Sequence, residues 1–202
     1  MIRTVISDLG RVVLWFDNEI FLRKLAERAG RPVDGVKAAV HGDLELLRRF
    51  DAGAITTAGF HARVMAIVGA DMPYDEFFAM YNDIFTPNAG VIDVLSRAKS
   101  AGYKLLLLSN TDPERFGFVR RTFPALRLFE GYVLSYEVKL LKPDPAIYRA
   151  AARTAGSEPG ECVFIDDMEE NVKAAVAAGL AGIHYLRETD LAAELRKLGL
   201  RL

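Results

Sequence analysis

Cysteine is nearly missing from this chain of 202 residues, in which Cys162 is the only thiol. A disulfide within the chain is therefore impossible, which excludes a small secreted fold held together by such bridges. The apolar run Cys162–Ile165 surrounds the thiol and predicts that it is buried and structural. A buried, unpaired thiol is typical of a reducing compartment, so we expect a cytoplasmic protein.

A dominant charge is missing as well, because 26 Lys and Arg stand against 27 Asp and Glu with no long block of either sign. Nucleic acids and anionic membranes attract basic patches, so we expect neither as a partner. Apolar runs such as Leu105–Leu108 are far too short to cross a bilayer. The expected partner is a small molecule, bound by a monomer or homodimer.

Regular alternation of apolar strands and capped helices is what the chain does contain, from Pro87 onward. Asp112-Pro113-Glu114 supplies an N-cap, a proline at the first helical position and a first-turn acid, and Asp144-Pro145 begins another helix in the same way. Uniformly apolar strands between helices predict a parallel sheet covered on both faces. The predicted fold class is α/β, a doubly wound, Rossmann-like core with strands near 104–108, 132–134, 163–165 and 183–185.

Residues 18–86 break this alternation, because they show helical periodicity without strands between. We interpret them as a helical cap inserted after the first strand, with hinges near Leu14–Asp17 and Thr86–Asn88. The expected domains are a core of residues 1–14 and 88–202 and a cap of residues 15–87. A cap inserted there would cover the carboxyl ends of the strands, where open α/β sheets bind ligands. The helices expected in it are Asn18–Ala29, Leu44–Asp51, Thr57–Val68 and Asp75–Phe85.

Polar residues follow four of the predicted strands. Asp8 ends the first strand, Ser109-Asn110-Thr111 ends the second, Lys142 follows the third, and Asp166-Asp167 ends the fourth. Each group alone also suits an ordinary turn, loop or helix cap. Together they place a carboxylate, hydroxyl and amide donors, a cation and two further carboxylates at one edge of the sheet. Asp8 is the strongest single signal, because a carboxylate ending a buried strand is costly unless it is used.

These segments resemble the four ordered motifs of the haloacid dehalogenase-like hydrolase superfamily, in the branch with a helical cap after the first motif. The resemblance implies that Asp8 is a nucleophile that forms an aspartyl-phosphate and that Ser109 and Lys142 hold the phosphoryl group. It also implies that Asp8, Asp167 and the backbone carbonyl of Gly10 bind Mg²⁺. The expected function is a Mg²⁺-dependent phosphomonoesterase acting on a small phosphate ester, with sugar phosphates as one candidate class.

The chemistry of the residues is consistent with that function. Three converging carboxylates, Asp8, Asp166 and Asp167, would repel one another without a cation, and an oxygen-only site suits Mg²⁺. Asp166 is either a ligand or a neighbour that orients one. The backbone amide of Asn110 lies before a predicted helix, a favourable place for phosphate. Asn171, on the first turn of the next predicted helix, is expected to orient Lys142 or a metal ligand.

Gly10 is the departure from the family pattern, which usually has a second Asp two residues after the nucleophile as general acid and base. A positioned acid or base typically contributes about 10²- to 10⁴-fold to the rate. The Asp-Leu-Gly sequence is similar to that of some sugar-phosphate phosphatases, so one interpretation is a phosphatase whose leaving group is activated or whose proton is handled elsewhere. The others are a phospho-ligand-binding protein with little turnover and a 2-haloacid dehalogenase, the last disfavoured by the extra carboxylates.

Four residues outside the motifs are weaker candidates. Asp17, near the first hinge, and His41, in a predicted loop of the cap, are possible replacements for the missing acid. Arg48 or Arg49 offers a guanidinium for polar groups at the far end of a substrate. Each also has an ordinary interpretation: a helix N-cap for Asp17, a solvated loop residue for His41, and a charged outer face for the two arginines.

Overall fold

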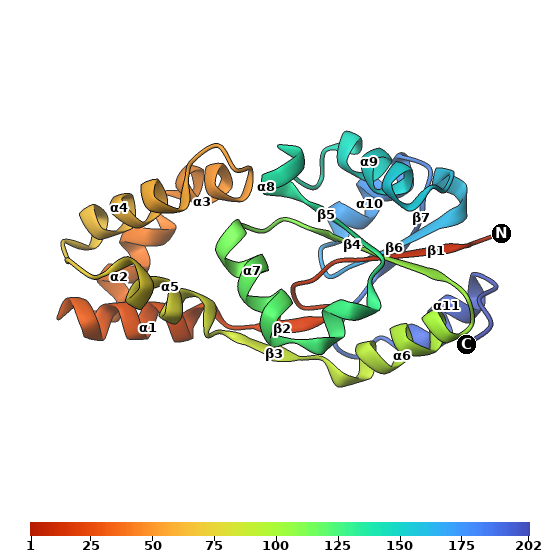
Figure 1. Ribbon diagram of the computed structural model, residues 1–202, viewed down its shortest axis with the longest axis horizontal. Helices are drawn as coiled ribbons and strands as arrows, with labels where there is room; N and C mark the ends of the chain where they lie inside the picture. The colour runs from red at the N-terminus through yellow and green to blue at the C-terminus, as the bar shows by residue number, and fades with distance from the viewer.

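A computed structural model gives the structure of the protein (Figure 1). It describes the backbone of residues 1–202 and every side chain except those of His41 and Leu44. Five parallel strands form the central sheet in the order β5-β4-β1-β6-β7, which puts β1 in the middle. The strands are β1 (Thr4–Ser7), β4 (Lys104–Ser109), β5 (Gly131–Leu134), β6 (Cys162–Asp166) and β7 (Ala181–His184).

Helices cover both faces of the sheet, which confirms the doubly wound α/β core. Val5 and Ile6, neighbours on β1, belong to apolar clusters on opposite faces. One cluster includes α6 (Ala89–Ser100), α7 (Pro113–Thr122) and α11 (Leu191–Lys197), and the other includes α9 (Pro145–Ala155) and α10 (Glu169–Ala177) (Figure 1). The remaining short elements of this part are α8 (Ser135–Val138) and the 3-10 turns η1 (Pro124–Leu128) and η2 (Pro159–Glu161).

The predicted helix caps are present in the core. Asp112 accepts hydrogen bonds from the backbone amides of Glu114 and Arg115, both at 2.9 Å, and so begins α7. Asp144 accepts from the amide of Ala146 at 2.8 Å and begins α9. These carboxylates accept hydrogen bonds from amides that have no partner within the helix. The cap at Asp112 therefore starts α7 only a few residues after the end of β4.

Between β1 and α6 the chain forms five helices, which gather at one end of the molecule (Figure 1). Their apolar side chains make a cluster of their own, in which Phe50 and Phe60 stack with ring centroids 4.1 Å apart. Three helices have the bounds expected from the sequence. The fourth expected helix, Asp75–Phe85, begins and ends earlier, as α5. The five are α1 (Asn18–Ala29), α2 (Val33–His41), α3 (Leu44–Asp51), α4 (Thr57–Val68) and α5 (Tyr74–Asn82).

Two features of this region were not expected from the sequence. Helix α2 begins after Pro32 without a side-chain cap and contains Gly35, so it lacks the usual start signal. The hinge segments form a two-stranded antiparallel ribbon of β2 (Leu14–Phe16) and β3 (Phe85–Pro87). Strands of three residues are too short to show an alternating pattern. The helices are therefore joined to the sheet by a paired ribbon.

Asn88 ties this ribbon to the core. Its side-chain amide donates to the backbone oxygen of Val12 at 2.8 Å and to the hydroxyl of Tyr185 at 3.0 Å, and the residue is buried. We predict that Asn88→Ala lowers the free energy of unfolding by about 1–3 kcal/mol, because it leaves a buried carbonyl without its donor. Urea unfolding measures this. Asn88→Asp, which keeps the shape but removes the donor, should also destabilise, and a wild-type midpoint in both variants would contradict the prediction.

Candidate functional site

A pocket of about 380 Å³ lies at the carboxyl ends of the strands and gathers residues that are distant in the sequence. Asp8 follows β1, Ser109 ends β4 and Asp167 follows β6, and these three strands are neighbours in the sheet. Lys142 reaches the same pocket from the segment between α8 and α9. The topology therefore brings all four predicted groups to one place.

Lys142 contacts two of the carboxylates at the pocket. Its ammonium nitrogen lies 2.7 Å from Asp8 Oδ1 and 2.6 Å from Asp166 Oδ2, and its side chain is only 2% exposed. Burial alone would lower the pKa of Lys142, but the two carboxylates raise it above its ordinary value. Lys142 therefore stays charged, and it holds the carboxylates that end two neighbouring strands.

Burial acts in the opposite direction on Asp8. It raises the pKa of this carboxyl to about 7, with Asp166 adding to the effect and Lys142 opposing it. The pKa of Asp167 is raised too, first by burial and then by Asp166. Ionisation of these groups is therefore costly in the protein alone, and a further cation would make it favourable.

Asp166 is already fully engaged by the protein. Besides Lys142, it receives hydrogen bonds from the backbone amide of Met168 at 2.8 Å and from the side-chain amide of Asn171 at 3.0 Å. Its side chain is completely buried. Asp166 is thus placed to orient Lys142, and Asn171 acts on Asp166 and not on Lys142 directly.

Asp8 and Asp167 are better placed to bind a cation. Asp8, Asp166 and Asp167 each offer a carboxylate oxygen within 4.8 Å of the others. Arg11 is the cation nearest to Asp167, at 3.8 Å, which is too long for a strong ion pair at an exposed guanidinium. Carboxylate oxygens are the ligands that Mg²⁺ prefers, so the residues present fit this ion.

Asn110 has a structural task in addition to the one expected. Its side-chain amide donates to the backbone oxygen of Lys142 at 3.0 Å, and its oxygen accepts from the Lys142 amide at 2.8 Å. This pair of bonds fixes the segment that carries Lys142. Ser109 makes only a weak contact of 3.4 Å to the backbone oxygen of Asn110, so its hydroxyl is available to a ligand.

Phe16 explains why position 10 is glycine. A Cβ atom on Gly10 would lie 2.8 Å from Phe16 Cε1, closer than carbon atoms approach without displacement. The ring packs against Phe85, with centroids 6.1 Å apart, and the guanidinium of Arg11 lies 5.2 Å from its centre. The space next to Gly10 is therefore filled by an aromatic ring from the ribbon, and a larger side chain there requires the ring to move.

The weaker candidates lie elsewhere. Asp17 is exposed and accepts from the amide of Glu19 at 2.9 Å, so it is the N-cap of α1. Arg48 and Arg49 are exposed and do not line the pocket around Lys142, and Arg49 lines a separate hollow with Asp43 and Arg63. The side chain of His41 lies outside the described residues.

Sequence reasoning missed four residues that line the pocket: Arg11, Phe16, Asn18 and Met168. Asn18 and Phe16 come from the hinge, where the direction of each side chain depends on the ribbon. Arg11 has a φ of 57°, a left-handed conformation that non-glycine residues seldom adopt. No sequence signal marks this conformation, although strained residues often occur at functional sites.

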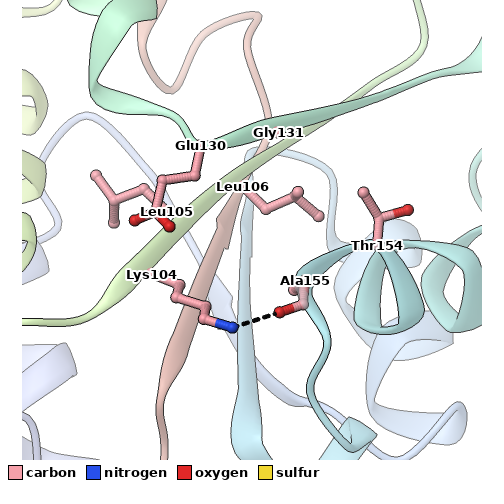
Figure 2. A pocket seen from close by; sticks show the side chains of 7 residues that line it. All are labelled: Lys104, Leu105, Leu106, Glu130, Gly131, Thr154 and Ala155. Carbon is pink, nitrogen blue, oxygen red and sulfur yellow. Dashed lines mark hydrogen bonds between the residues drawn. The ribbon is translucent and has the colours of Figure 1, made fainter.

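A separate pocket of about 220 Å³ lies at the amino ends of β4 and β5 (Figure 2). Its most prominent polar group, the ammonium of Lys104, donates to the backbone oxygen of Ala155 at 2.9 Å. The rest of its lining includes one carboxylate, Glu130, together with Leu106 and Thr154, and it does not hold a cluster of carboxylates like that of Asp8, Asp166 and Asp167 (Figure 2). The chemistry of the described residues is therefore concentrated at the opposite end of the sheet.

The match to a family model agrees with this geometry. The model of the haloacid dehalogenase-like hydrolases matches residues 4–179, which is most of the chain. The chain belongs to this family and is a hydrolase of it.

Several phosphatases are among its relatives. The chain is 26% identical over 157 residues to a sesquiterpene phosphatase of Aspergillus oryzae, a match that covers 76% of this chain and 79% of that protein. It is 29% identical over 170 residues to a phosphoglycolate phosphatase of Pseudomonas putida, covering 77% of this chain and 59% of that protein. The second match spans less than two thirds of that relative, and both matches are below 30% identity, so each activity is stated of the relative alone.

A solved structure shows the same fold over nearly the whole chain. It is a HAD family enzyme from Bacteroides thetaiotaomicron in complex with magnesium and inorganic phosphate, crystallised as a mutant. The TM-score is 0.83 at 26% identity, and the superposition covers 97% of this chain and 100% of that one.

None of the helices described for this chain has both the length and the apolar character of a bilayer span.

The contact between Gly10 and Phe16 leads to a prediction about stability. Gly10→Ala should lower the free energy of unfolding by about 1–2 kcal/mol, because the added methyl group displaces the Phe16 ring. Guanidinium unfolding of Gly10→Ala, Phe16→Leu and the double variant measures the coupling. The double variant should lose less stability than the sum of the two single variants. Additive losses would show that the ring and position 10 do not compete for space.

Proposed function

We propose that this protein is a Mg²⁺-dependent phosphomonoesterase that acts on a small phosphate ester through an aspartyl-phosphate on Asp8. The observation that carries the proposal is the buried ion cluster in which Lys142 contacts Asp8 and Asp166, with Asp167 beside them. Membership of the hydrolase family and the phosphatases among the relatives support it. We also propose that the chain has two domains: a core of residues 1–14 and 88–202, and a cap of residues 15–87.

The charge of the cluster supports a divalent cation. Asp8, Asp166 and Asp167 face the single ammonium of Lys142, which leaves two negative charges when all are ionised. Asp8, Asp167 and the backbone carbonyl of Gly10 would hold Mg²⁺. When bound, the ion supplies positive charge that lets an anionic nucleophile and a phosphate share the pocket.

The first step is an attack by a carboxylate oxygen of Asp8 on phosphorus. The bond from phosphorus to the ester oxygen breaks, and that oxygen leaves with the bonding electron pair. Lys142 neutralises charge on the phosphoryl oxygens, and the Ser109 hydroxyl is available to donate a hydrogen bond to one of them. These groups are held in place before substrate arrives, which lowers the cost of reaching the transition state.

The second step is hydrolysis of the aspartyl-phosphate by water, which releases phosphate and restores Asp8. No side chain at position 10 is available to protonate the leaving oxygen or to deprotonate this water. The ring of Phe16 fills the space beside Gly10. We therefore expect faster reaction with leaving groups that need no proton, such as acyl, aryl or anomeric oxygens.

The first test is phosphate release from acetyl phosphate, an aryl phosphate and a panel of sugar phosphates. Release should require Mg²⁺ and fall about 10⁴-fold in Asp8→Asn, because the nucleophile is lost. Asp93→Asn, a change at an exposed carboxylate of α6, is the matched control and should behave like wild type. Phosphate binding without turnover on any substrate would favour the phospho-ligand-binding alternative, and chloride release from a haloacid would favour a dehalogenase.

The time course provides an independent prediction. Without a base for the second step, the aspartyl-phosphate should accumulate, so an aryl phosphate should give a burst of phenol followed by a slower steady rate. The burst should be comparable to the enzyme concentration and absent in Asp8→Asn. Rapid-mixing absorbance measurements at high enzyme concentration resolve it. A linear time course from the first turnover would show that dephosphorylation is not the slow step.

A further inference from the structure

A second recess lies between the cap helices and α7, outside the cluster of Asp8 and Lys142. It has a volume of about 190 Å³ and is walled by side chains from all five cap helices, among them Phe21, Phe60 and Tyr81. Its polar side chains are Asn18, Asp51, Arg115 and Tyr81, and the hydroxyl of Tyr81 already donates to Asp112. The recess therefore combines a mostly apolar wall with a small polar end.

Arg115 is held rigidly at this polar end. Its Nη2 donates to Asn18 Oδ1 at 3.0 Å, its guanidinium lies 4.1 Å from the centre of the Tyr81 ring, and its Nε is 3.9 Å from Asp112 Oδ2. The Nε–H is buried, yet it has no hydrogen-bond partner in the part of the chain that the structure describes. A buried donor without an acceptor is costly and calls for an explanation.

Asp51 faces the same recess from the end of α3. Its backbone oxygen accepts a hydrogen bond from Ser135 Oγ at 2.6 Å, which ties the cap to the core next to this carboxyl group. Burial raises the pKa of Asp51 to about 7, Asp112 adds to the rise and Arg115 opposes it. A carboxyl group here is thus able to pair with a neutral polar ligand at little electrostatic cost.

The recess adjoins the catalytic pocket. Asn18 lines both cavities. Arg115 also lines a small hollow of about 70 Å³ that it shares with Gly10, Phe16 and Ser109, the residues next to Asp8. A molecule attached to a phosphoryl group at Asp8 would therefore extend past Phe16 towards Arg115.

We propose that this recess binds the leaving group of the substrate, and that this group is small, mostly apolar and has one hydroxyl group at its far end. The hydroxyl oxygen accepts a hydrogen bond from the guanidinium of Arg115, and its hydrogen is donated to Asp51. The proposal rests on the proposed function and extends it to a class of substrate.

The composition of the recess argues against two other classes. A sugar has several hydroxyl groups, and the apolar walls offer most of them no partner, which is costly. An anionic end group such as a carboxylate would meet Asp51 and Asp112 with only the charge of Arg115 to balance them. A single neutral hydroxyl accepts from the Arg115 guanidinium without adding charge.

The test compares para-(hydroxymethyl)phenyl phosphate with para-methylphenyl phosphate, which have similar leaving groups but differ in the far hydroxyl. We expect kcat/KM to be about 10- to 100-fold higher for the first, mostly through KM, as for hydrogen bonds to charged groups. Arg115→Met and Asp51→Asn should abolish the difference, and Leu47→Trp, which places a larger apolar side chain in the wall of the recess, should raise KM for both. Arg121→Gln, an exposed residue of the same helix, is the control and should keep the wild-type preference.

Acetyl phosphate separates failure of this proposal from failure of the proposed function, because its leaving group is too small to reach the recess. Turnover of acetyl phosphate with equal kcat/KM for the two aryl phosphates, or better turnover of a hexose phosphate, would overturn the substrate class and leave the function intact. If no phosphate is hydrolysed, calorimetric binding of para-(hydroxymethyl)phenol tests the recess directly. Affinity no higher than that of para-methylphenol would then overturn the proposal.

Discussion

The site depends on the contacts of the buried Lys142 ammonium with Asp8 and Asp166. This ammonium joins carboxylates that end two neighbouring strands, and it is almost completely removed from solvent. Taking one ammonium and two carboxylates out of water is expensive, and their attraction offsets this only when each has further partners. Asp166 has them in Met168 and Asn171, whereas Asp8 has fewer. The imbalance leaves Asp8 as the carboxylate that is available for chemistry, with Asp166 as its structural counterpart.

The sheet and its edge were predictable because their signals are local. Uniformly apolar strands, the caps at Asp112 and Asp144, and polar residues at the strand ends together place Asp8, Ser109 and Lys142 at one edge. The ribbon and helix α2 were not predictable, since three-residue strands and an uncapped helix leave no pattern. The recess was the hardest to foresee. Arg115 sits three residues after the N-cap of α7, and no sequence motif marks it.

Phe16 links the cap to the chemistry of the site. Because its ring lies where a side chain at position 10 would begin, the residue types at these two positions are not independent. A carboxylate at position 10 would require the Phe16 ring to move or a smaller residue at position 16, and either change would alter the packing against Phe85 in the ribbon. The absence of a side chain at position 10 is thus coupled to the packing of the ribbon that joins the five helices to the sheet.

The interface between cap and core is polar where it meets α7, although the interior of the cap is apolar. Asp112 both begins α7 and accepts a hydrogen bond from Tyr81 at 3.0 Å, so the residue that orders a core helix also fixes a cap helix. Ser135 does the same on the other side by accepting from the amide of Thr111 and donating to Asp51. Such directional contacts fix the cap at one distance from the strand ends. Helices held in this way leave a recess of defined size, so its volume and its polar end limit which groups fit there.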